Sequence, residues 1–238
     1  MKAVVLAAGK GQRLKSVVRD VPKPMVRVRG RPILEQNVCW LRDAGVQDIY
    51  MNLHHLPEVI TKHFGGGEEW GVRIMYSRER RLLGTAGAVR KIADDCWGDV
   101  REPFLVVYGD NLLSGFDLRR IVEFHNSRAG AGTICLHYRE DVSHSGIAVL
   151  DSDGRILRFV EKPTPDQAVS HWVNAGLYVL AASALRYVPQ GTSDFGRDIF
   201  PRMLEAGERL YGLTTNAALV AVDTPEMLAQ VVADRGWI

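Results

Sequence analysis

The sequence has few cysteines, little excess charge and no long apolar run, and each shortage excludes a class of protein. Its three cysteines, Cys39, Cys96 and Cys135, lie far apart among apolar neighbours, which is typical of reduced core residues and not of a disulfide framework or a metal cluster. The 30 basic and 28 acidic side chains leave a formal net charge of only +2, so nucleic acid is not favoured as a partner. No segment approaches the roughly 18 apolar residues of a membrane helix, and the apolar stretch 3–8 is too short for a secretion signal. These shortages predict a cytoplasmic protein without a membrane partner.

The patterning of the 238 residues predicts one α/β domain. Short apolar, β-branched runs predict buried strands, and amphipathic segments between them predict helices, an alternation that is typical of a mostly parallel sheet covered on both faces. In the first half, strands are expected at 2–8, 48–53, 72–77 and 104–110, and helices at 32–45, 86–97 and 116–127. From 132 to 180 the pattern changes to strands, and helices return at about 196–206 and 225–235.

A glycine loop with basic residues follows the first expected strand. The segment reads LAAGKGQRL at 6–14, and PKPM follows at 22–25. The dinucleotide fingerprint would need a third glycine at position 14, where Leu14 stands, and the P-loop pattern finds no match either. What remains is a strand that ends in small residues, where a flat base or ribose can lie, followed by glycine N–H groups for phosphate oxygens. A surface loop with incidental basic residues fits this segment equally well.

Six further segments, in order, make the chain resemble the sugar-1-phosphate nucleotidylyltransferases, or nucleoside-diphosphate-sugar pyrophosphorylases. They are LLGTAGAVR at 82–90, VVYGDNL at 106–112, SGIAVLD at 145–151, FVEKP at 159–163, VNAGLYVL at 173–180 and DTPEML at 223–228. The resemblance covers essentially the whole chain and implies a three-layer α/β/α sandwich with a mostly parallel mixed sheet, the Rossmann-like nucleotidyltransferase fold. It also implies the reaction of an NTP with a sugar-1-phosphate to give an NDP-sugar and pyrophosphate.

The resemblance assigns expected roles to individual residues. Arg13 would hold the departing β- and γ-phosphates, and Lys23 would neutralise the α-phosphate. Asp110 would bind Mg²⁺ near the α-phosphate. The family's usual second metal aspartate is replaced by Ala221, so Asp223 is expected to supply that carboxylate from a shifted place. The remaining expected contacts are to the nucleotide, from Leu6, Ala7, Ala8, Gly9, Gly11, Gly84 and Thr85, and to the sugar phosphate, from Gly146, Glu161, Lys162 and Asn174.

The substrates are predicted less closely than the reaction. The segments LLGTAGAVR and SVVRDVPKPM look most like mannose-1-phosphate and heptose-1-phosphate guanylyltransferases, which favours GTP with a mannose- or heptose-like phosphate. A uridylyl-, thymidylyl- or cytidylyltransferase of the same family is the alternative. The resemblance also implies a single catalytic domain over 1–238 without a C-terminal left-handed β-helix domain, and it leaves homo-oligomer formation open.

Two functions of other classes compete with this prediction. The first is an inactive regulatory subunit that binds a nucleotide sugar. The absence of the usual aspartate at position 221 favours it, whereas the presence of Arg13, Lys23, Asp110 and Lys162 argues against it. An NAD-dependent oxidoreductase would need the missing glycine at position 14 and an acidic residue at the end of a second strand, where DIYMNLHH has none.

Overall fold

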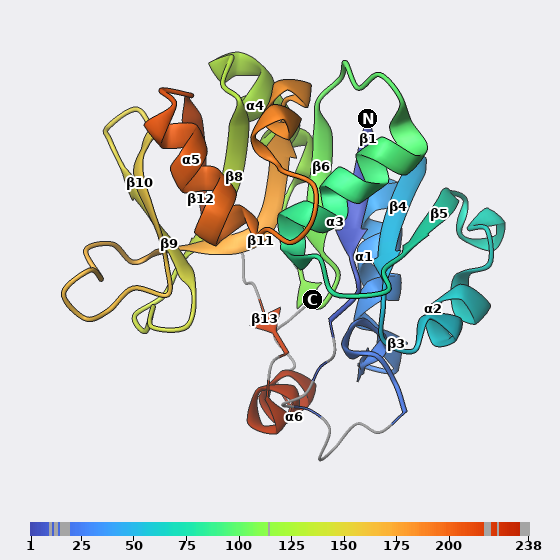
Figure 1. The fold of residues 1–238 in the computed structure, drawn as a ribbon. Coiled ribbons are helices and arrows are strands. Elements are labelled where there is room, and N and C mark those ends of the chain that lie inside the picture. The colour runs from blue at the N-terminus through green and yellow to red at the C-terminus, as the bar shows by residue number, and fades with distance from the viewer. Residues whose placement is uncertain are drawn as a thin grey trace. The chain divides into compact units, whose positions relative to one another are not determined.

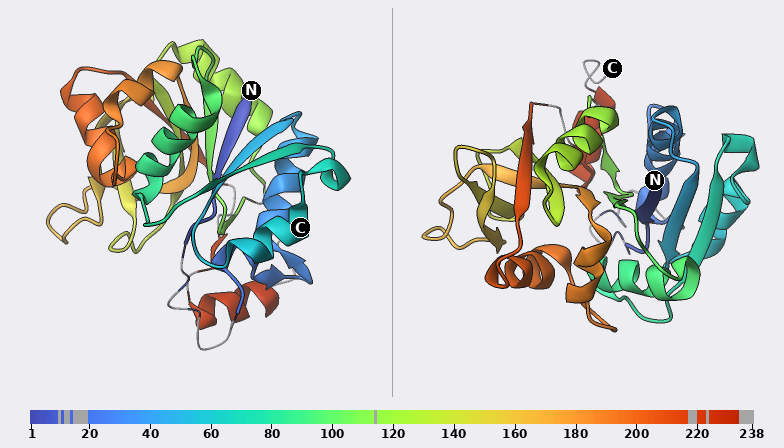
Figure 2. Two further views of the ribbon diagram at one scale, coloured as in Figure 1. Left: turned by 45° about the vertical axis from the view of Figure 1, so that its right-hand side comes forward. Right: turned by 90° about the horizontal axis from the view of Figure 1, so that it is seen from above.

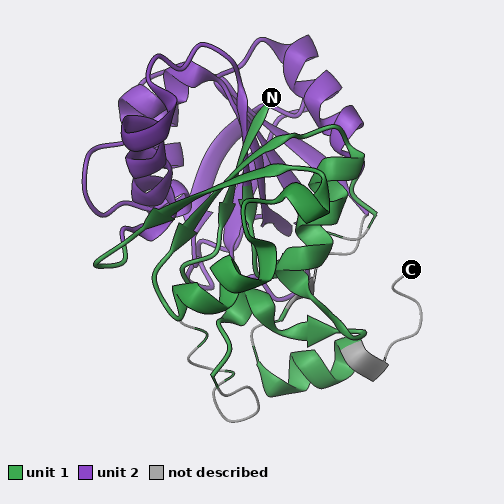
Figure 3. Ribbon diagram, turned by 90° about the vertical axis from the view of Figure 1, so that its right-hand side faces the viewer, with its two compact units in different colours: residues 1–82, 107–116, 217–238 green, residues 83–106, 117–216 purple. Residues whose placement is uncertain are grey.

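The computed structural model describes residues 1–9, 11, 14, 20–113, 115–216, 220–222 and 224–233. Two of the predicted site residues, Arg13 and Asp223, lie outside this part of the chain. The chain divides into two compact units, drawn in different colours in Figure 3. Unit 1 comprises residues 1–82, 107–116 and 217–238, and unit 2 comprises residues 83–106 and 117–216.

Unit 1 is built on three parallel strands, β1 (Lys2–Leu6), β4 (Asp48–Leu53) and β5 (Arg73–Arg78), which lie side by side (Figure 1). Their interiors are mostly apolar, as strands buried on both faces require. Leu6 pairs with Asn52, and Asn52 with Ser77, so the three strands end at one edge. In open α/β sheets that edge, at the carboxyl ends of the strands, is where ligands bind.

The helices of unit 1 are α1 (Ile33–Asp43), α2 (Pro57–Phe64) and α6 (Pro225–Ala233). Proline stands just before or at the first helical position of each, where its missing N–H costs nothing. Short strand pairs join β2 (Arg27–Val28) to β3 (Arg31–Pro32) and β7 (Asn111–Leu112) to β13 (Val220–Ala221). A core cluster combines residues from these distant segments: Leu14, Val26, Val28, Ile33, Leu112, Val222 and Val231.

Unit 2 contains a mixed group of five strands (Figures 1 and 2). They are β8 (Gly132–Tyr138), β9 (Gly146–Leu150), β10 (Ile156–Glu161), β11 (Trp172–Leu180) and β12 (Leu210–Thr215). Strand β9 lies between β10 and β11, and β8 lies between β11 and β12; all of these pairs are antiparallel except β8 with β12. The helices are α3 (Gly84–Ile92), α4 (Leu118–Arg128) and α5 (Phe200–Glu205).

Aromatic side chains fill the core of unit 2 next to the end of β10. Phe159, Tyr178, Phe195 and Phe200 form a contact group in which neighbouring ring centroids are 5.1–5.5 Å apart.

Asp117 caps α4 by accepting hydrogen bonds from the N–H groups of Arg119 and Arg120. The remaining strand, β6 (Phe104–Tyr108), gives its first three residues to unit 2 and its last two to unit 1.

Most of the predicted elements are present, with shifted ends. Strand β1 ends at Leu6 and not at residue 8, because the N–H of Ala7 bonds to the side chain of Asn52. Helix α3 begins at Gly84, two residues earlier than predicted, and a wider helical turn continues it over Ala93–Trp97. Helix α2 and strand β12 were not predicted. Among the described residues, no helix is long and apolar enough to cross a membrane.

Candidate functional site

Lys23 and Asp110, 87 residues apart in the sequence, form an ion pair in unit 1. Lys23 begins a short 3₁₀ helix, Lys23–Met25, and only 9% of the residue is exposed. Its Nζ atom lies 2.5 Å from Oδ2 of Asp110, a short charge-assisted hydrogen bond. The Asp110 side chain is 25% exposed, so its carboxylate is accessible from solution. The structure therefore brings together the predicted phosphate lysine and the predicted metal carboxylate.

The backbone on both sides of Asp110 is fixed by contacts with β1 and α1. The Gly109 N–H donates to the carbonyl of Leu6 at 2.9 Å. A Cβ atom on Gly109 would lie 2.9 Å from that carbonyl oxygen and 3.2 Å from Cδ1 of Leu34, so this close approach requires glycine. The buried Asn37 of α1 donates to the carbonyl of Asn111 at 2.9 Å and to that of Gly109 at 3.4 Å. Asn37, which was not predicted from the sequence, thus helps to hold the Asp110 turn.

Gly11 is the glycine of the loop that contacts Lys23. Its φ of +55° lies in the left-handed region, and a Cβ atom there would lie 2.9 Å from Cβ of Lys23. The N–H of Leu14 donates to the Gly11 carbonyl at 3.0 Å. Around Gly9, by contrast, a Cβ atom would meet nothing within 4 Å. Gly11 is therefore needed for the placement of Lys23, whereas the phosphate contacts of both glycines stay predictions.

If Lys23 acts on a phosphate as predicted, Gly11→Ala should lower kcat/KM by about tenfold or more, because the added methyl group displaces Lys23 and a misplaced catalytic group is costly. The left-handed backbone adds a stability loss of about 1–2 kcal/mol. Gly30→Ala is the matched control, since Gly30 has a φ of +78° but an added methyl group there would meet nothing within 4 Å. Steady-state kinetics and urea denaturation of both variants check this. If both variants lost activity equally, the contact with Lys23 would not be the cause of the loss.

A buried chain of hydrogen bonds joins the ends of the three parallel strands. The Ala7 N–H donates to Oδ1 of Asn52 at 2.8 Å, and Nδ2 of Asn52 donates to Oε1 of Glu79 at 2.8 Å. Asn52 and Glu79 are 4% and 6% exposed. Neither residue was predicted from the sequence. The sequence signal that could have found them was the polar residue Asn52 among the apolar residues near the end of a strand. A buried polar side chain needs hydrogen-bond partners, so such a residue indicates a buried hydrogen bond.

Gly84 and Thr85, in unit 2, lie against the segment 193–195. Gly84 has a φ of +73°, and a Cβ atom there would lie 2.5 Å from the carbonyl oxygen of Ser193. The N–H groups of Ala86 and Gly87 donate to that same carbonyl at 2.9 and 3.1 Å. The N–H of Thr85 donates to Oδ1 of Asp194 at 3.0 Å. The N–H groups of Thr85, Ala86 and Gly87 are therefore already hydrogen-bonded within unit 2, and a base at Gly84 and Thr85 would have to contact other groups. This base contact stays a prediction.

The carboxylate of Glu161 lies in a niche between two glycines of unit 2. A Cβ atom on either Gly146 or Gly196 would come closer than 3.0 Å to its Oε2 atom. Burial raises the pKa of Glu161, and the positive charge of Lys162 opposes this rise. Within the described part of the chain, this carboxylate has no hydrogen bond or ion pair. A partly buried acceptor without a protein partner suits hydrogen bonds from sugar hydroxyl groups.

Lys162 and Asn174 differ in how far their side chains are already engaged. Lys162 has a φ of +50°, its N–H donates to the Ser145 carbonyl at 3.1 Å, and the residue is exposed. Nδ2 of Asn174 donates to the Tyr178 hydroxyl at 2.8 Å, and its Oδ1 accepts from the Gly176 N–H at 2.9 Å. Both ends of the Asn174 amide are thus hydrogen-bonded within β11, at the point where the pairing of β11 with β8 shifts register. The sugar contacts of both residues stay predictions.

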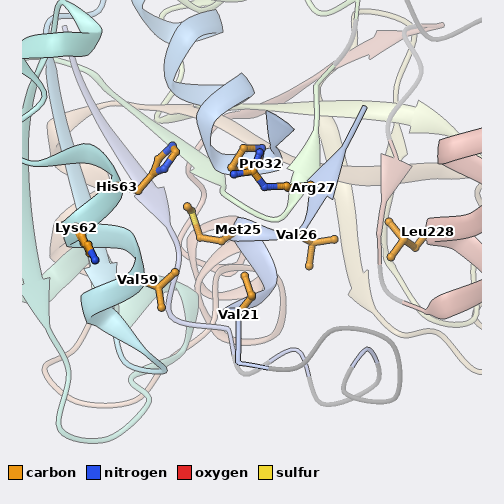
Figure 4. A pocket seen from close by; sticks show the side chains of 9 residues that line it. All are labelled: Val21, Met25, Val26, Arg27, Pro32, Val59, Lys62, His63 and Leu228. Carbon is orange, nitrogen blue, oxygen red and sulfur yellow. The ribbon is translucent and has the colours of Figure 1, made fainter. Parts of the chain in front are cut away.

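A separate pocket of about 660 Å³ lies in unit 1 (Figure 4). None of the predicted site residues lines it, but Met25 and Val26 of its wall directly follow the helix position of Lys23. Its wall is apolar apart from three basic side chains. The lining residues are Val21, Met25, Val26, Arg27, Pro32, Val59, Lys62, His63 and Leu228.

Comparison with known proteins shows a match over nearly the whole chain. Residues 2–237 match the nucleotidyl transferase family. The chain belongs to this family. It is 35% identical to a UTP–glucose-1-phosphate uridylyltransferase of Synechocystis sp. over 90% of this chain and 58% of the relative. It is 32% identical to a mannose-1-phosphate guanylyltransferase of Mycobacterium tuberculosis over 98% of this chain and 64% of the relative. The chain thus spans about three fifths of the length of these curated relatives.

Solved structures of the same fold also match. A Bacillus anthracis protein crystallised in complex with sucrose superposes with a TM-score of 0.86 at 23% identity, over 98% of this chain and 94% of that one. HddC from Yersinia pseudotuberculosis, crystallised in complex with GMP-PN, superposes with a TM-score of 0.78 at 26% identity, over 97% of each chain. The predicted fold class, a three-layer α/β/α sandwich with a mostly parallel mixed sheet, is confirmed, since the fold has a mixed sheet with parallel strands and flanking helices. The family resemblance is confirmed as well.

Proposed function

We propose that this protein transfers a nucleotidyl group from an NTP, with GTP preferred, to a mannose- or heptose-like sugar-1-phosphate. The products are an NDP-sugar and pyrophosphate. The ion pair of Lys23 and Asp110 carries this proposal, because it presents a cation and a carboxylate at the strand edge where α/β sheets bind ligands. Family membership supplies the reaction class.

In this reaction, an oxygen of the sugar phosphate attacks the α-phosphorus in line, and the bond to pyrophosphate breaks. Both reactants are anions, so catalysis depends on positioning and electrostatics more than on covalent chemistry. Lys23 neutralises the α-phosphate, and Arg13 holds the leaving pyrophosphate. Lys162 holds the sugar phosphate while Glu161 accepts from its hydroxyls. One such contact at about 4 Å gives roughly 4 kcal/mol of attraction at an effective dielectric of about 20, so several cations are needed together.

The residues present fit a divalent cation of the Mg²⁺ type. Mg²⁺ prefers oxygen ligands and is commonly held by one or two carboxylates together with substrate phosphates. Within the described residues, no three or more His, Cys, Asp or Glu side chains lie close enough together to hold a metal ion by themselves. The residues therefore fit a cation whose other ligands are substrate phosphates. Asp110 would hold the ion, with Asp223 as the proposed second ligand. The ion, when bound, screens phosphate charge and polarises the α-phosphate.

The preference for guanine is supported by two of the similar proteins. The Mycobacterium tuberculosis relative is a guanylyltransferase, and HddC was crystallised with GMP-PN. The uridylyltransferase relative, at 35% identity, favours UTP as the second candidate.

Turnover of each nucleotide with each sugar phosphate tests this proposal. GTP, ATP, UTP and dTTP are each paired with mannose-1-phosphate, a heptose-1-phosphate and glucose-1-phosphate, and pyrophosphate release is measured. An unmade buried hydrogen bond costs about 1–3 kcal/mol, so GTP should exceed UTP by roughly 5- to 150-fold in kcat/KM. A tenfold preference for UTP or dTTP would overturn the base assignment. Absence of turnover with every pair would favour the regulatory subunit.

A further inference from the structure

We infer that the pocket of unit 1 shown in Figure 4 is a second ligand site, which takes a small anion with an apolar body. Its volume of about 660 Å³ is within the range of roughly 300–1,000 Å³ that is usual for small-molecule sites. Three separate segments line it: residues 21–32, α2 and α6. Because none of the predicted site residues is among the lining residues, the existence of this site does not depend on the proposed function.

The wall of the pocket presents an apolar surface to the ligand. Met25 and Val26 are buried, and Val59 of α2 and Leu228 of α6 are half-buried. An apolar ring or chain on this wall would remove its own surface and that of the wall from water, which is favourable. A sugar ring would instead leave hydroxyl groups without hydrogen-bond partners there. The wall therefore selects an apolar body.

The charged side chains of the wall select an anion. Among the described residues that line the pocket none is acidic, whereas Arg27, Lys62 and His63 are basic. Nη1 of Arg27 donates to the Gly30 carbonyl, and Nε2 of His63 lies 3.0 Å from Oε2 of Glu35. Within the described part of unit 1, the other guanidinium nitrogens of Arg27 and Nδ1 of His63 have no hydrogen-bond partner. Since neighbours hold these two side chains in place, they are the expected contacts of the anion.

The carboxylate beside His63 is already compensated by a second cation. Nε of Arg31 donates to Oε1 of Glu35 at 2.8 Å, while Oε2 faces the imidazole of His63. The Glu35 charge therefore does little to repel an anion in the pocket. Complementary charge at a binding surface favours the correctly charged ligand and disfavours others, so a cation of the same shape should bind less well.

The apolar wall belongs to the turn that carries Lys23. The N–H of Val26 donates to the Lys23 carbonyl at 3.1 Å, and the N–H of Met25 donates to the Pro22 carbonyl at 2.8 Å. A ligand that packs on Met25 and Val26 thus contacts the turn whose first residue bonds to Asp110. An occupied pocket should therefore alter turnover through Lys23, and this second step rests on the proposed function.

A matched pair of fluorescent probes tests the site in the whole chain. Anilinonaphthalene sulfonate is an aromatic anion that brightens in apolar surroundings, and phenylnaphthylamine has the same rings without the sulfonate. We expect Arg27→Gln to weaken binding of the anion by about three- to tenfold and to change binding of the neutral probe by less than about twofold. The control is Arg101→Gln, which removes an exposed arginine of unit 2 and should change neither. Equal weakening of both probes by Arg27→Gln would overturn the preference for an anion.

A second variant tests the apolar wall. Val59→Glu puts a carboxylate into it and should weaken binding of the anion by about tenfold or more, whereas Val59→Gln, of similar size but uncharged, should weaken it less. Val169→Glu makes the same change at a valine of unit 2 that is 61% exposed and should have no effect. Circular dichroism checks the fold of each variant. If neither Arg27→Gln nor Val59→Glu weakens binding of the anion, the pocket is not its site and the inference is wrong.

Saturating GTP with Mg²⁺ separates this pocket from the proposed nucleotide site. Binding of the anion that GTP abolishes and that Val59→Glu leaves unchanged belongs to the nucleotide site and contradicts the inference. In turnover assays, the anionic probe should change kcat/KM by about fivefold or more in the wild type but not in Val59→Glu. No change in the wild type, or the same change in both proteins, overturns the coupling to Lys23. If no pair of substrates is turned over, the proposed function fails, and the fluorescence titrations still decide the pocket.

Discussion

Lys23→Met is expected to lower kcat/KM for nucleotidyl transfer by about 10²- to 10³-fold, the usual cost of removing one preorganised charge at a reacting phosphate or oxyanion. Methionine keeps the apolar stem that packs against Gly11 but removes the ammonium group that bonds to Asp110. Since the ammonium neutralises the α-phosphate in the proposed reaction, kcat should fall more than KM for the nucleotide rises. Steady-state assays of pyrophosphate release with saturating sugar phosphate measure both.

Two measurements separate this effect from misfolding. Removal of one partner of a fully buried ion pair costs about 3–5 kcal/mol, but the Asp110 side chain is 25% exposed, so the stability loss of Lys23→Met should be smaller. Urea denaturation reports it. Lys62→Met is the matched control, because Lys62 is an exposed lysine of α2 and makes no hydrogen bond or ion pair within the described part of unit 1. Lys23→Met activity within tenfold of this control would remove Lys23 from the chemical step.

The pair itself shows where prediction from sequence ends. Lys23 and Asp110 were each predicted from the resemblance of their segments to the family. Their contact was not, because nothing local relates residues 87 positions apart. The roles of Gly109 and Asn37 depend on how the segment 109–111 packs against β1 and α1, and no pattern within one segment of the sequence contains that packing.

The fold was more predictable in its first half than in its second. Strands buried on both faces are continuous apolar runs, and β4 begins and ends at the predicted residues. Each residue of β12 pairs with a residue of β8 that lies 78 positions earlier in the sequence, and LYGLTT is not a continuous apolar run that would mark it as a strand. At the site, Thr85 was predicted as a nucleotide contact, but its bond to Asp194 spans 109 positions and was invisible in the sequence.

Asp110→Asn tests whether this carboxylate serves the cation or only holds Lys23. The amide has the same shape, and its carbonyl oxygen can still accept from Nζ of Lys23, where Oδ2 now lies at 2.5 Å. What it loses is the negative charge that a Mg²⁺ ligand supplies. The two roles therefore predict different results from one substitution.

If Asp110 holds the metal, kcat should fall by about 10³-fold, because a catalytic cation is worth several kcal/mol in transition-state stabilisation. The Mg²⁺ concentration for half-maximal activity should also rise at least tenfold, measured by titration after EDTA treatment. Asp48→Asn is the control, since it removes a carboxylate from the surface ion pair with Arg73 in the same unit. If Asp110 only positioned Lys23, the asparagine variant would retain most activity with an unchanged Mg²⁺ requirement, and the carboxylate would lose its proposed place as a metal ligand.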